Sequence, residues 1–254
     1  MNAKASIKRF GKMFTPAYLT KIAVLTAISF IMYMYIKIPL AFIFPSFLEF
    51  QFSELPAMLG GFALGPFAGA LITVLKCVLK LPFTGTAFVG ELTDMLLGLL
   101  YVCPASIFYH YRKTRKSALF ALLIGTACST AGAILVNRFI SVPFYVEFFF
   151  HGNFNIIVNI VKPLYKNVNS NNFYAIYLSA GVLPFNLLRL GVVSLLTFLM
   201  YKHLSGILHW EIKSKKQEEK PMQQELQAPS EQDEVLMLEE MEENELDKNT
   251  FPQE

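Results

Sequence analysis

A few polar side chains interrupt otherwise apolar stretches of this sequence, and their spacing predicts that they act together. Asn186 and Arg189 are three residues apart in one apolar run, and Glu91 and Asp94 are three apart in another. Residues at i and i+3 lie on the same face of a helix. An arginine inside a membrane costs about 2.5–3.5 kcal/mol on insertion scales, so Arg189 needs a carboxylate, a carbonyl or a ligand as its partner.

Two interpretations of these groups are open from the residues alone. In the first, Arg189 forms an internal ion pair with Asp94 or Glu91. In the second, these side chains and Asn137, which ends a neighbouring apolar run, line a pocket whose amides offer hydrogen-bond donors and acceptors to a ligand. The two interpretations are compatible if the ion pair opens onto the pocket.

Residues 38–51 are rich in aromatic side chains and carry two prolines, which predicts an ordered loop at a membrane surface. The aromatic rings belong either to an interfacial belt or to a lid that covers a flat apolar ligand. If the loop is a lid, we expect Phe47 and Leu48 to contact that ligand. The phenylalanines concerned are Phe42, Phe44, Phe47, Phe50 and Phe52.

Small residues recur at four-residue spacing in two places, at Ala23 and Ala27 and again at Gly61, Gly65 and Gly69. Such stripes let a second helix backbone approach closely, which is how membrane helices associate. Packing within the chain is the commoner use of this pattern, and a partner protein is the alternative. Spacing alone does not distinguish the two uses.

Two lysines, Lys76 and Lys80, also share a helical face within an apolar run. Lys80 is close enough to the end of the run for its amine to extend to the membrane surface. Lys76 lies deeper, so it requires an internal partner that the sequence does not identify.

The composition indicates a membrane protein with an attached polar tail. Of the 254 residues, 54% are hydrophobic and 16% charged, whereas soluble domains carry about 25% charged residues. Residues 1–210 contain 17 Lys/Arg and 5 Asp/Glu, and residues 211–254 contain 5 and 14. The acidic tail is predicted to be mostly disordered. The cations form small clusters between apolar runs, a pattern that does not favour nucleic-acid binding.

The apolar runs predict an all-α integral membrane protein with six transmembrane helices. One long run is divided at Gly65-Pro66, because proline removes a helical hydrogen-bond donor and crowds the preceding turn. The helix before that break is short, and the last helix contains Pro184 and Gly191 as possible irregularities. The predicted helices are 18–36, 53–64, 66–82, 89–111, 117–142 (ending near Pro143) and 173–202, and residues 147–172 are predicted to be a polar loop.

The positive-inside rule predicts which side each connection occupies. Basic clusters stand before the first helix, between the fourth and fifth helices, and after the sixth. With six helices these three places share one side, so both termini are predicted to be cytoplasmic. The predicted organisation is a cytoplasmic segment 1–17, a membrane substrate-binding domain 18–204, and a cytoplasmic tail 205–254.

No sequence motif for catalysis is present. The chain lacks a GxxxxGK[ST] phosphate-binding loop, an HExxH zinc motif and a GxSxG nucleophile motif. Its four histidines are scattered, and its three cysteines lie in apolar runs without metal-ligand spacing. We therefore expect no enzyme activity, no cofactor and no metal site.

Several segments resemble the riboflavin-specific S component of energy-coupling factor (ECF) transporters. They are FQFSELPA at 50–57, GGFALGPFAGALI at 60–72, LVN at 135–137 with VPFY at 142–145, and PFNLLR at 184–189. They follow in order, and the resemblance spans 18–204. It implies a multi-pass protein of the prokaryotic cell membrane that binds riboflavin from outside. It also implies three partners, a transmembrane T component and two ATP-binding subunits.

The resemblance also implies roles for individual residues. Asn137 and Asn186 match amides that hydrogen-bond the flavin ring, and Ala23 and Ala27 match the motif that docks on the T component. Arg189 stands where the family usually has lysine, which leaves a flavin phosphate or another vitamin as an alternative ligand. Two other classes stay open: a proton-coupled secondary transporter that uses Glu91 or Asp94, and a membrane scaffold that recruits partners through its acidic tail.

Overall fold

The computed structural model describes residues 15–201 except 39, 46 and 166. The predicted tail 205–254, and the predicted N-terminal segment apart from residues 15–17, lie outside the described residues. The division into these segments and the sidedness of the helices therefore stay predictions.

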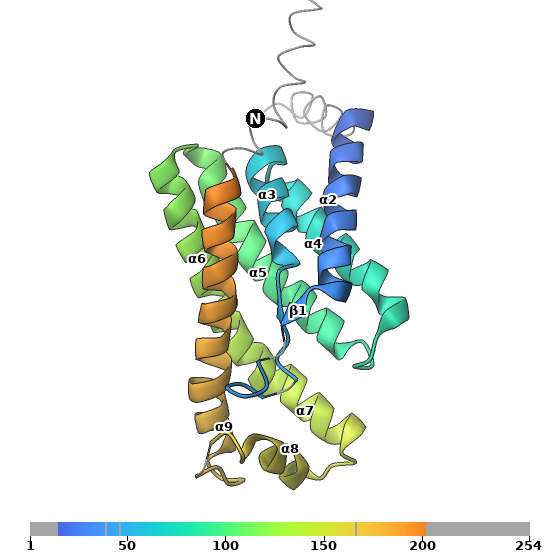
Figure 1. Cartoon of the computed structure of the whole chain (residues 1–254), viewed down its shortest axis with the longest axis vertical. Coiled ribbons are helices and arrows are strands. Elements are labelled where there is room, and N and C mark those ends of the chain that lie inside the picture. Colours follow the sequence, from blue (N-terminus) through green and yellow to red (C-terminus); the bar gives the residue numbers. More distant parts are fainter. Residues whose placement is uncertain (1–14, 39, 46, 166, 202–254) are drawn as a thin grey trace, which may run out of the picture. The chain divides into compact units, whose positions relative to one another are not determined.

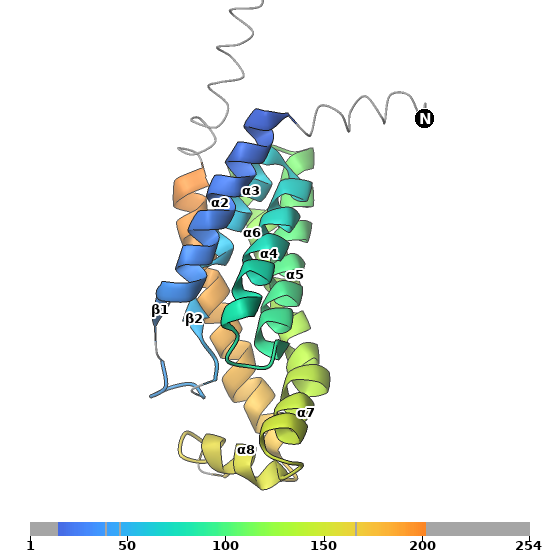
Figure 2. The same cartoon turned by 90° about the vertical axis from the view of Figure 1, so that its right-hand side faces the viewer.

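Five helices in the described part of the chain are long and apolar enough to cross a membrane, and they pack side by side in a bundle (Figures 1 and 2). A further apolar helix, α3, is shorter, as the break at Gly65-Pro66 predicts. The five long helices are α2 (Pro16–Tyr35), α4 (Pro66–Lys80) with the short η1 (Leu81–Phe83), α5 (Val89–Tyr111), the helix Arg115–Phe149 and the last helix, Phe173–Tyr201; α3 is Glu54–Leu64.

The glycines at the junction of α3 and α4 pack inside the bundle. A Cβ atom on Gly69 would stand 2.8 Å from the Cα of Gly61 and 2.6 Å from a methyl carbon of Val102 on α5, so only glycine permits this approach. Gly65 has a φ of 111°, a backbone conformation that L side chains rarely adopt. Gly61 and Gly69 therefore serve internal packing, in agreement with the commoner interpretation of such a pattern, whereas Gly65 provides the backbone conformation of the turn.

The helix that starts at Arg115 continues through Pro143, so the predicted end near that residue is wrong. It consists of α6 (Arg115–Val136), η2 (Asn137–Ser141), α7 (Val142–Phe144) and η3 (Tyr145–Phe149). In η2 the turns are wider than in an α-helix, and the N–H of Val142 bonds to the carbonyl of Asn137 five residues back. Pro143 has no N–H to donate to the preceding turn, and its ring would crowd a regular α-helical turn. The wider turn of η2, just before the proline, accommodates it, so the helix continues past Pro143.

The last helix also has a wide turn before a proline. It begins with α9 (Phe173–Ile176), widens in η4 (Tyr177–Val182) just before Pro184, and continues as regular helix to Tyr201. Gly191 lies within the regular part, so only the irregularity expected near Pro184 is present. Wide helical turns occur often at functional sites, and here they stand at Asn137 and four residues before Asn186.

The two predicted loops both contain regular structure. Strands β1 (Lys37–Ile38) and β2 (Phe50–Gln51) pair antiparallel at the base of the 38–51 loop, with Lys37 opposite Gln51 (Figure 2). Residues 147–172 are less irregular than predicted, because 147–149 belong to η3 and a helix, α8 (Phe154–Val161), follows. The apolar face of α8, formed by Ile157, Val158 and Val161, is buried against the ends of the bundle helices.

Candidate ligand-binding site

A cavity of about 490 Å³ lies between the 38–51 loop and the helices α2, α5, Arg115–Phe149 and Phe173–Tyr201. Its volume is in the range of small-molecule sites. All seven residues that the sequence suggested for the ligand line this cavity. They are Phe47, Leu48, Glu91, Asp94, Asn137, Asn186 and Arg189.

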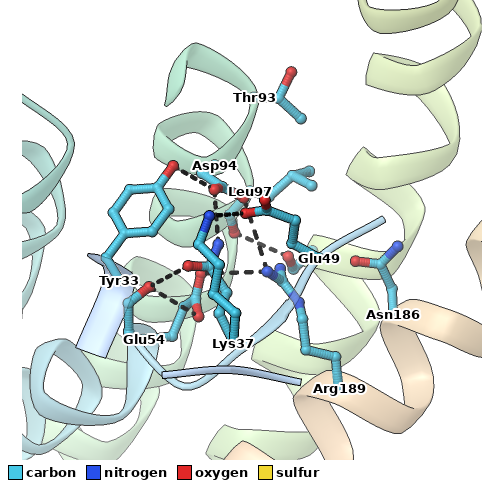
Figure 3. Close-up of polar contacts among 12 residues, drawn as sticks. Tyr33, Lys37, Glu49, Glu54, Thr93, Asp94, Leu97, Asn186 and Arg189 are labelled. Carbon is cyan, nitrogen blue, oxygen red and sulfur yellow. Dashed lines mark hydrogen bonds and ion pairs between the residues drawn. The ribbon is translucent and has the colours of Figure 1, made fainter. Parts of the chain in front are cut away.

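Arg189 lies at the cavity wall between two carboxylates (Figure 3). Its Nη1 atom is 3.8 Å from Oδ1 of Asp94 and 3.6 Å from Oε1 of Glu54. The other carboxylate oxygen of Asp94 accepts hydrogen bonds from Nε2 of Gln51, at 2.7 Å, and from the hydroxyl of Tyr33. Asp94 therefore connects α2, strand β2, α5 and the last helix. The predicted pair Arg189–Asp94 is present, and it opens onto the pocket.

Glu54 also provides the partner that Lys76 requires. Its carboxylate is 3.4 Å from Nζ of Lys76, and that amine donates a 2.6 Å hydrogen bond to the hydroxyl of Ser53. Both charged side chains are completely buried. The sequence pointed to the need for this partner but not to Glu54, because only the position of the short α3 inside the bundle brings the carboxylate to the lysine.

Glu91 is occupied by other groups, so the alternative pair Arg189–Glu91 is wrong. Its carboxylate is 3.2 Å from Nζ of Lys80 and accepts hydrogen bonds of 2.8 and 2.9 Å from the hydroxyls of Thr84 and Thr86. The amine of Lys80 also stands 4.3 Å from the centre of the Tyr33 ring. Lys80 is thus buried toward the cavity and does not extend to the membrane surface, because a carboxylate and an aromatic face are available inside.

The two asparagines that face the cavity differ in how much hydrogen-bonding capacity is left for a ligand. Asn137 donates from Nδ2 to the carbonyl of Ala133, and its Oδ1 accepts a 2.7 Å hydrogen bond from the Tyr177 hydroxyl. Asn186 donates from Nδ2 to the carbonyl of Val182, whereas its Oδ1 accepts no hydrogen bond from the described residues. Asn186 also lies beside Arg189 on the same helix (Figure 3).

The aromatic loop contributes one ring to the cavity and packs others elsewhere. Phe47 lines the cavity and contacts Tyr177 and Tyr145, with ring centres 5.8 and 6.3 Å apart. Phe44 is buried against Phe185, whereas the side chain of Phe42 is 74% exposed. The loop thus has a face toward the cavity, as a lid requires, and an outward face, as an interfacial belt requires.

The rim of the cavity carries one exposed ion pair. Lys37 on β1 pairs with Glu49, which lies just before β2 in the sequence, and both side chains are partly accessible to solvent. The sequence did not predict this pair, because the two residues are brought together only by the antiparallel pairing of the loop ends.

Ala23 and Ala27 lie on the exposed face of α2, away from the cavity. Packing within the described part of the bundle therefore does not explain this pair of alanines. Both sit among exposed apolar residues of the same helix, including Val24, Ile28 and Ile31.

Metal-ligand clusters are absent from the described residues, where no group of three or more His, Cys, Asp or Glu side chains is placed to hold an ion. The cysteines Cys77, Cys103 and Cys128 are free thiols. The residues that line the cavity offer hydrogen bonding, ion pairing and aromatic contact.

Comparison with known proteins gives concordant results. A family model described as "ECF transporter, substrate-specific component" matches residues 17–201. The riboflavin transporter RibU of Staphylococcus aureus is 29% identical over 190 residues, which are 75% of this chain and 91% of that protein. The riboflavin transporter FmnP of Bacillus subtilis is 26% identical over 183 residues, 71% of this chain and 87% of that protein.

A further relative and a solved structure agree with these matches. The riboflavin transporter RibU of Streptococcus thermophilus is 31% identical over 197 residues, 75% of this chain and 83% of that protein. The solved structure, described as the S component of a bacterial ECF transporter, aligns with a TM-score of 0.56 and 27% identity. It covers 75% of this chain and 96% of that chain.

Proposed function

The chain belongs to the family of substrate-specific components of ECF transporters, and on that premise we propose that it binds riboflavin in the cavity described above. The resemblance noted in the sequence and the helical membrane fold of these S components are thereby confirmed. Its relatives are transporters, so the chain is not an enzyme but a multi-pass protein of the bacterial cell membrane.

The observation that carries the proposal is the composition of the cavity wall. A flavin ring is flat and aromatic, with hydrogen-bond donors and acceptors along one edge. The cavity offers the ring of Phe47 for its face, and for its edge the amides of Asn137 and Asn186. We expect Leu48 to add apolar contact. We also expect Arg189 to face the ligand while the carboxylates of Glu54 and Asp94 hold its guanidinium in place.

The charges of the wall favour the uncharged vitamin over its phosphate. The lining residues include three cations, and each of them is paired with a carboxylate that also lines the cavity. These pairs are Lys37–Glu49, Lys80–Glu91 and Arg189–Asp94. A phosphate group would have to displace a carboxylate from one of these pairs, because no lining cation is left without a counter-charge.

A fluorescence titration of the purified full chain tests the proposal. Riboflavin fluorescence should be quenched to saturation at one flavin per chain, and flavin mononucleotide should bind at least about tenfold more weakly, which is 1.4 kcal/mol. Folate and thiamine serve as controls that should not compete. Tight binding of thiamine or folate without quenching of riboflavin would show that the ligand is another vitamin.

We propose further that the exposed face of α2 docks on a T component, which acts with two ATP-binding subunits to drive import. Ala23→Trp and Ala27→Trp should then abolish ATP-dependent uptake in cells and leave riboflavin binding by the purified chain intact. Ala131→Trp, at an exposed alanine of α6, is the matched control and should retain uptake. Loss of binding in the α2 variants would mean that the alanines support the fold.

The same uptake assay distinguishes this proposal from proton-coupled transport through Glu91 or Asp94. Uptake by the assembled complex should stop when ATP is depleted and should persist with a proton uncoupler as long as ATP is supplied. The reverse pattern would favour the secondary transporter.

A further inference from the structure

A second hollow of the described bundle lies away from the cavity, on its outer surface between α6 and the last helix. It has a volume of about 340 Å³ and is lined by Ile134 from α6 and by five residues from the start of the last helix, Tyr174, Ala175, Leu178, Ser179 and Leu183. Figure 1 shows these two helices side by side. None of the six residues lines the candidate ligand cavity.

The groove is apolar along its length. The hydroxyl of Ser179 donates to the carbonyl of Ala175 one turn earlier, so the helix itself satisfies it. Leu183 lies nine residues beyond Tyr174, which is about 13 Å further along the helix. The groove thus runs along the last helix, from the end of the bundle that carries Tyr174 toward its middle.

A cation stands at the Tyr174 end of the groove. The guanidinium carbon of Arg138 lies 3.7 Å from the centre of the Tyr174 ring, and Arg138 is one helical turn from Ile134. The Arg138 side chain is exposed, and no carboxylate forms an ion pair with it in the part of the chain that the structure describes. Its stacking on Tyr174 holds the positive charge beside the groove.

The depth of Arg138 matches the headgroup region of a bilayer. It lies 23 residues after Arg115, where α6 begins next to a basic cluster. That separation corresponds to about 35 Å of helix, slightly more than the ~30 Å hydrocarbon core. With Arg115 at one membrane surface, Arg138 therefore reaches the other surface, and this holds for either orientation of the chain.

We propose that this groove binds an anionic phospholipid, with its phosphate on Arg138 and one acyl chain along Ile134, Leu178 and Leu183. Charge complementarity selects the occupant, because an uncompensated guanidinium at headgroup depth attracts an anionic lipid headgroup. A guanidinium also forms two parallel hydrogen bonds to a phosphate. The apolar groove below Arg138 matches a hydrocarbon chain.

Native mass spectrometry of the full chain tests the proposal, with phosphatidylglycerol and phosphatidylcholine of identical acyl chains supplied in equal amounts. Wild type should retain phosphatidylglycerol about fivefold or more over phosphatidylcholine. Arg138→Gln should reduce this preference to about equal retention, and Arg138→Lys should keep part of it. Excess inorganic phosphate should not displace the lipid, because a free phosphate lacks the acyl chain.

Two tryptophan substitutions test the acyl part of the site. Leu183→Trp fills the groove and should reduce retention of both lipids, whereas Leu187→Trp, at an exposed leucine one turn further that does not line the groove, should not. Melting temperatures show whether each variant is folded. If Arg138→Gln unfolds, the two leucine variants still test whether a lipid acyl chain occupies the groove.

Equal retention of the two lipids by wild type, or equal effects of Leu183→Trp and Leu187→Trp, would overturn the proposal. Displacement of the lipid by inorganic phosphate would also overturn it, because the site would then recognise phosphate alone. These outcomes are independent of riboflavin binding.

Discussion

Two groups of polar residues at and beside the cavity are built in different ways. A charged cluster of Tyr33, Gln51, Glu54, Lys76, Asp94 and Arg189 brings together α2, α3, α4, α5, the last helix and strand β2, and its charges cancel internally. An amide group of Asn137, Tyr177 and Asn186 carries no charge, and Oδ1 of Asn186 accepts no hydrogen bond from the described residues.

This difference indicates a division of roles between stability and recognition. Buried charges demand partners, because an unpaired one is strongly destabilising, so the charged cluster constrains how the helices come together. A neutral amide can leave a donor or an acceptor unpaired at a smaller cost in folding free energy. Variants of the charged cluster should therefore change stability most, and variants of the amide group should change ligand binding most.

Removing the charge of Arg189 should have the largest effect. Arg189→Met removes the cation that lies 3.6 Å from the Glu54 carboxylate and 3.8 Å from that of Asp94, and breaking such a buried pair costs about 3–5 kcal/mol. The apparent melting temperature in detergent should fall sharply, and Arg189→Lys, which keeps the charge, should lose less. If Arg189→Met melts at the same temperature as wild type, the charged cluster does not stabilise the fold as proposed.

Asn186→Leu should weaken ligand binding with little change in stability. Loss of the amide leaves a polar atom of the bound flavin without a partner, at about 1–3 kcal/mol, or about a 5- to 150-fold increase in Kd. Riboflavin titration measures the change. Asn159→Leu, at an exposed position of α8, is the control and should bind as wild type does. If Asn186→Leu lowers the melting temperature more than Arg189→Met does, the division of roles is wrong.

Tyr177→Phe should have a smaller effect on binding. The hydroxyl of Tyr177 fixes the Asn137 amide, and the net value of one hydrogen bond is about 0.5–1.5 kcal/mol, so Kd should rise about 2- to 10-fold. Tyr165→Phe removes a hydroxyl that bonds to the carbonyl of Ala180, outside the cavity lining, and should leave the Kd unchanged. Equal effects of the two variants would mean that the Tyr177 hydroxyl acts on the helix and not on the amide.

Glu49→Gln should have the smallest effect and should change selectivity. It frees Lys37 at the rim, where the exposed pair itself contributes less than about 1 kcal/mol. Affinity for flavin mononucleotide should increase a few-fold at low salt and return toward the wild-type value at high salt, because salt screens exposed charges. Riboflavin binding should not change, and Glu147→Gln, at an exposed acid outside the cavity lining, should alter neither affinity. A gain that persists at high salt would exclude a rim charge as its cause.

Much of the helical framework could be predicted from the residues alone. The break at Gly65-Pro66, the limits of α5 at Val89 and Tyr111, and the first helix all agree with the apolar runs to within about two residues. The end predicted near Pro143 was wrong, because a wide turn before a proline supplies the room that an α-helical turn does not. Side-chain periodicity does not report such a turn.

The polar residues of the cavity could also be predicted only in part from the sequence. Their types and i, i+3 spacing identified Asn137, Asn186, Arg189, Glu91 and Asp94 as one group, because each is costly in an apolar helix unless it has a function or a partner. Which carboxylate meets which cation was not determined by spacing. Glu91 pairs with Lys80, and Glu54 serves both Lys76 and Arg189.

The residue types alone thus show that these groups must be neutralised within an apolar bundle, since the hydrocarbon core offers them no water. The pairing itself depends on the packing of the helices, because the rotation of each helix and the entry of the short α3 between its neighbours set which charges lie within about 4 Å of one another. The same packing left the Asn186 amide at the cavity and the guanidinium of Arg138 exposed over the ring of Tyr174.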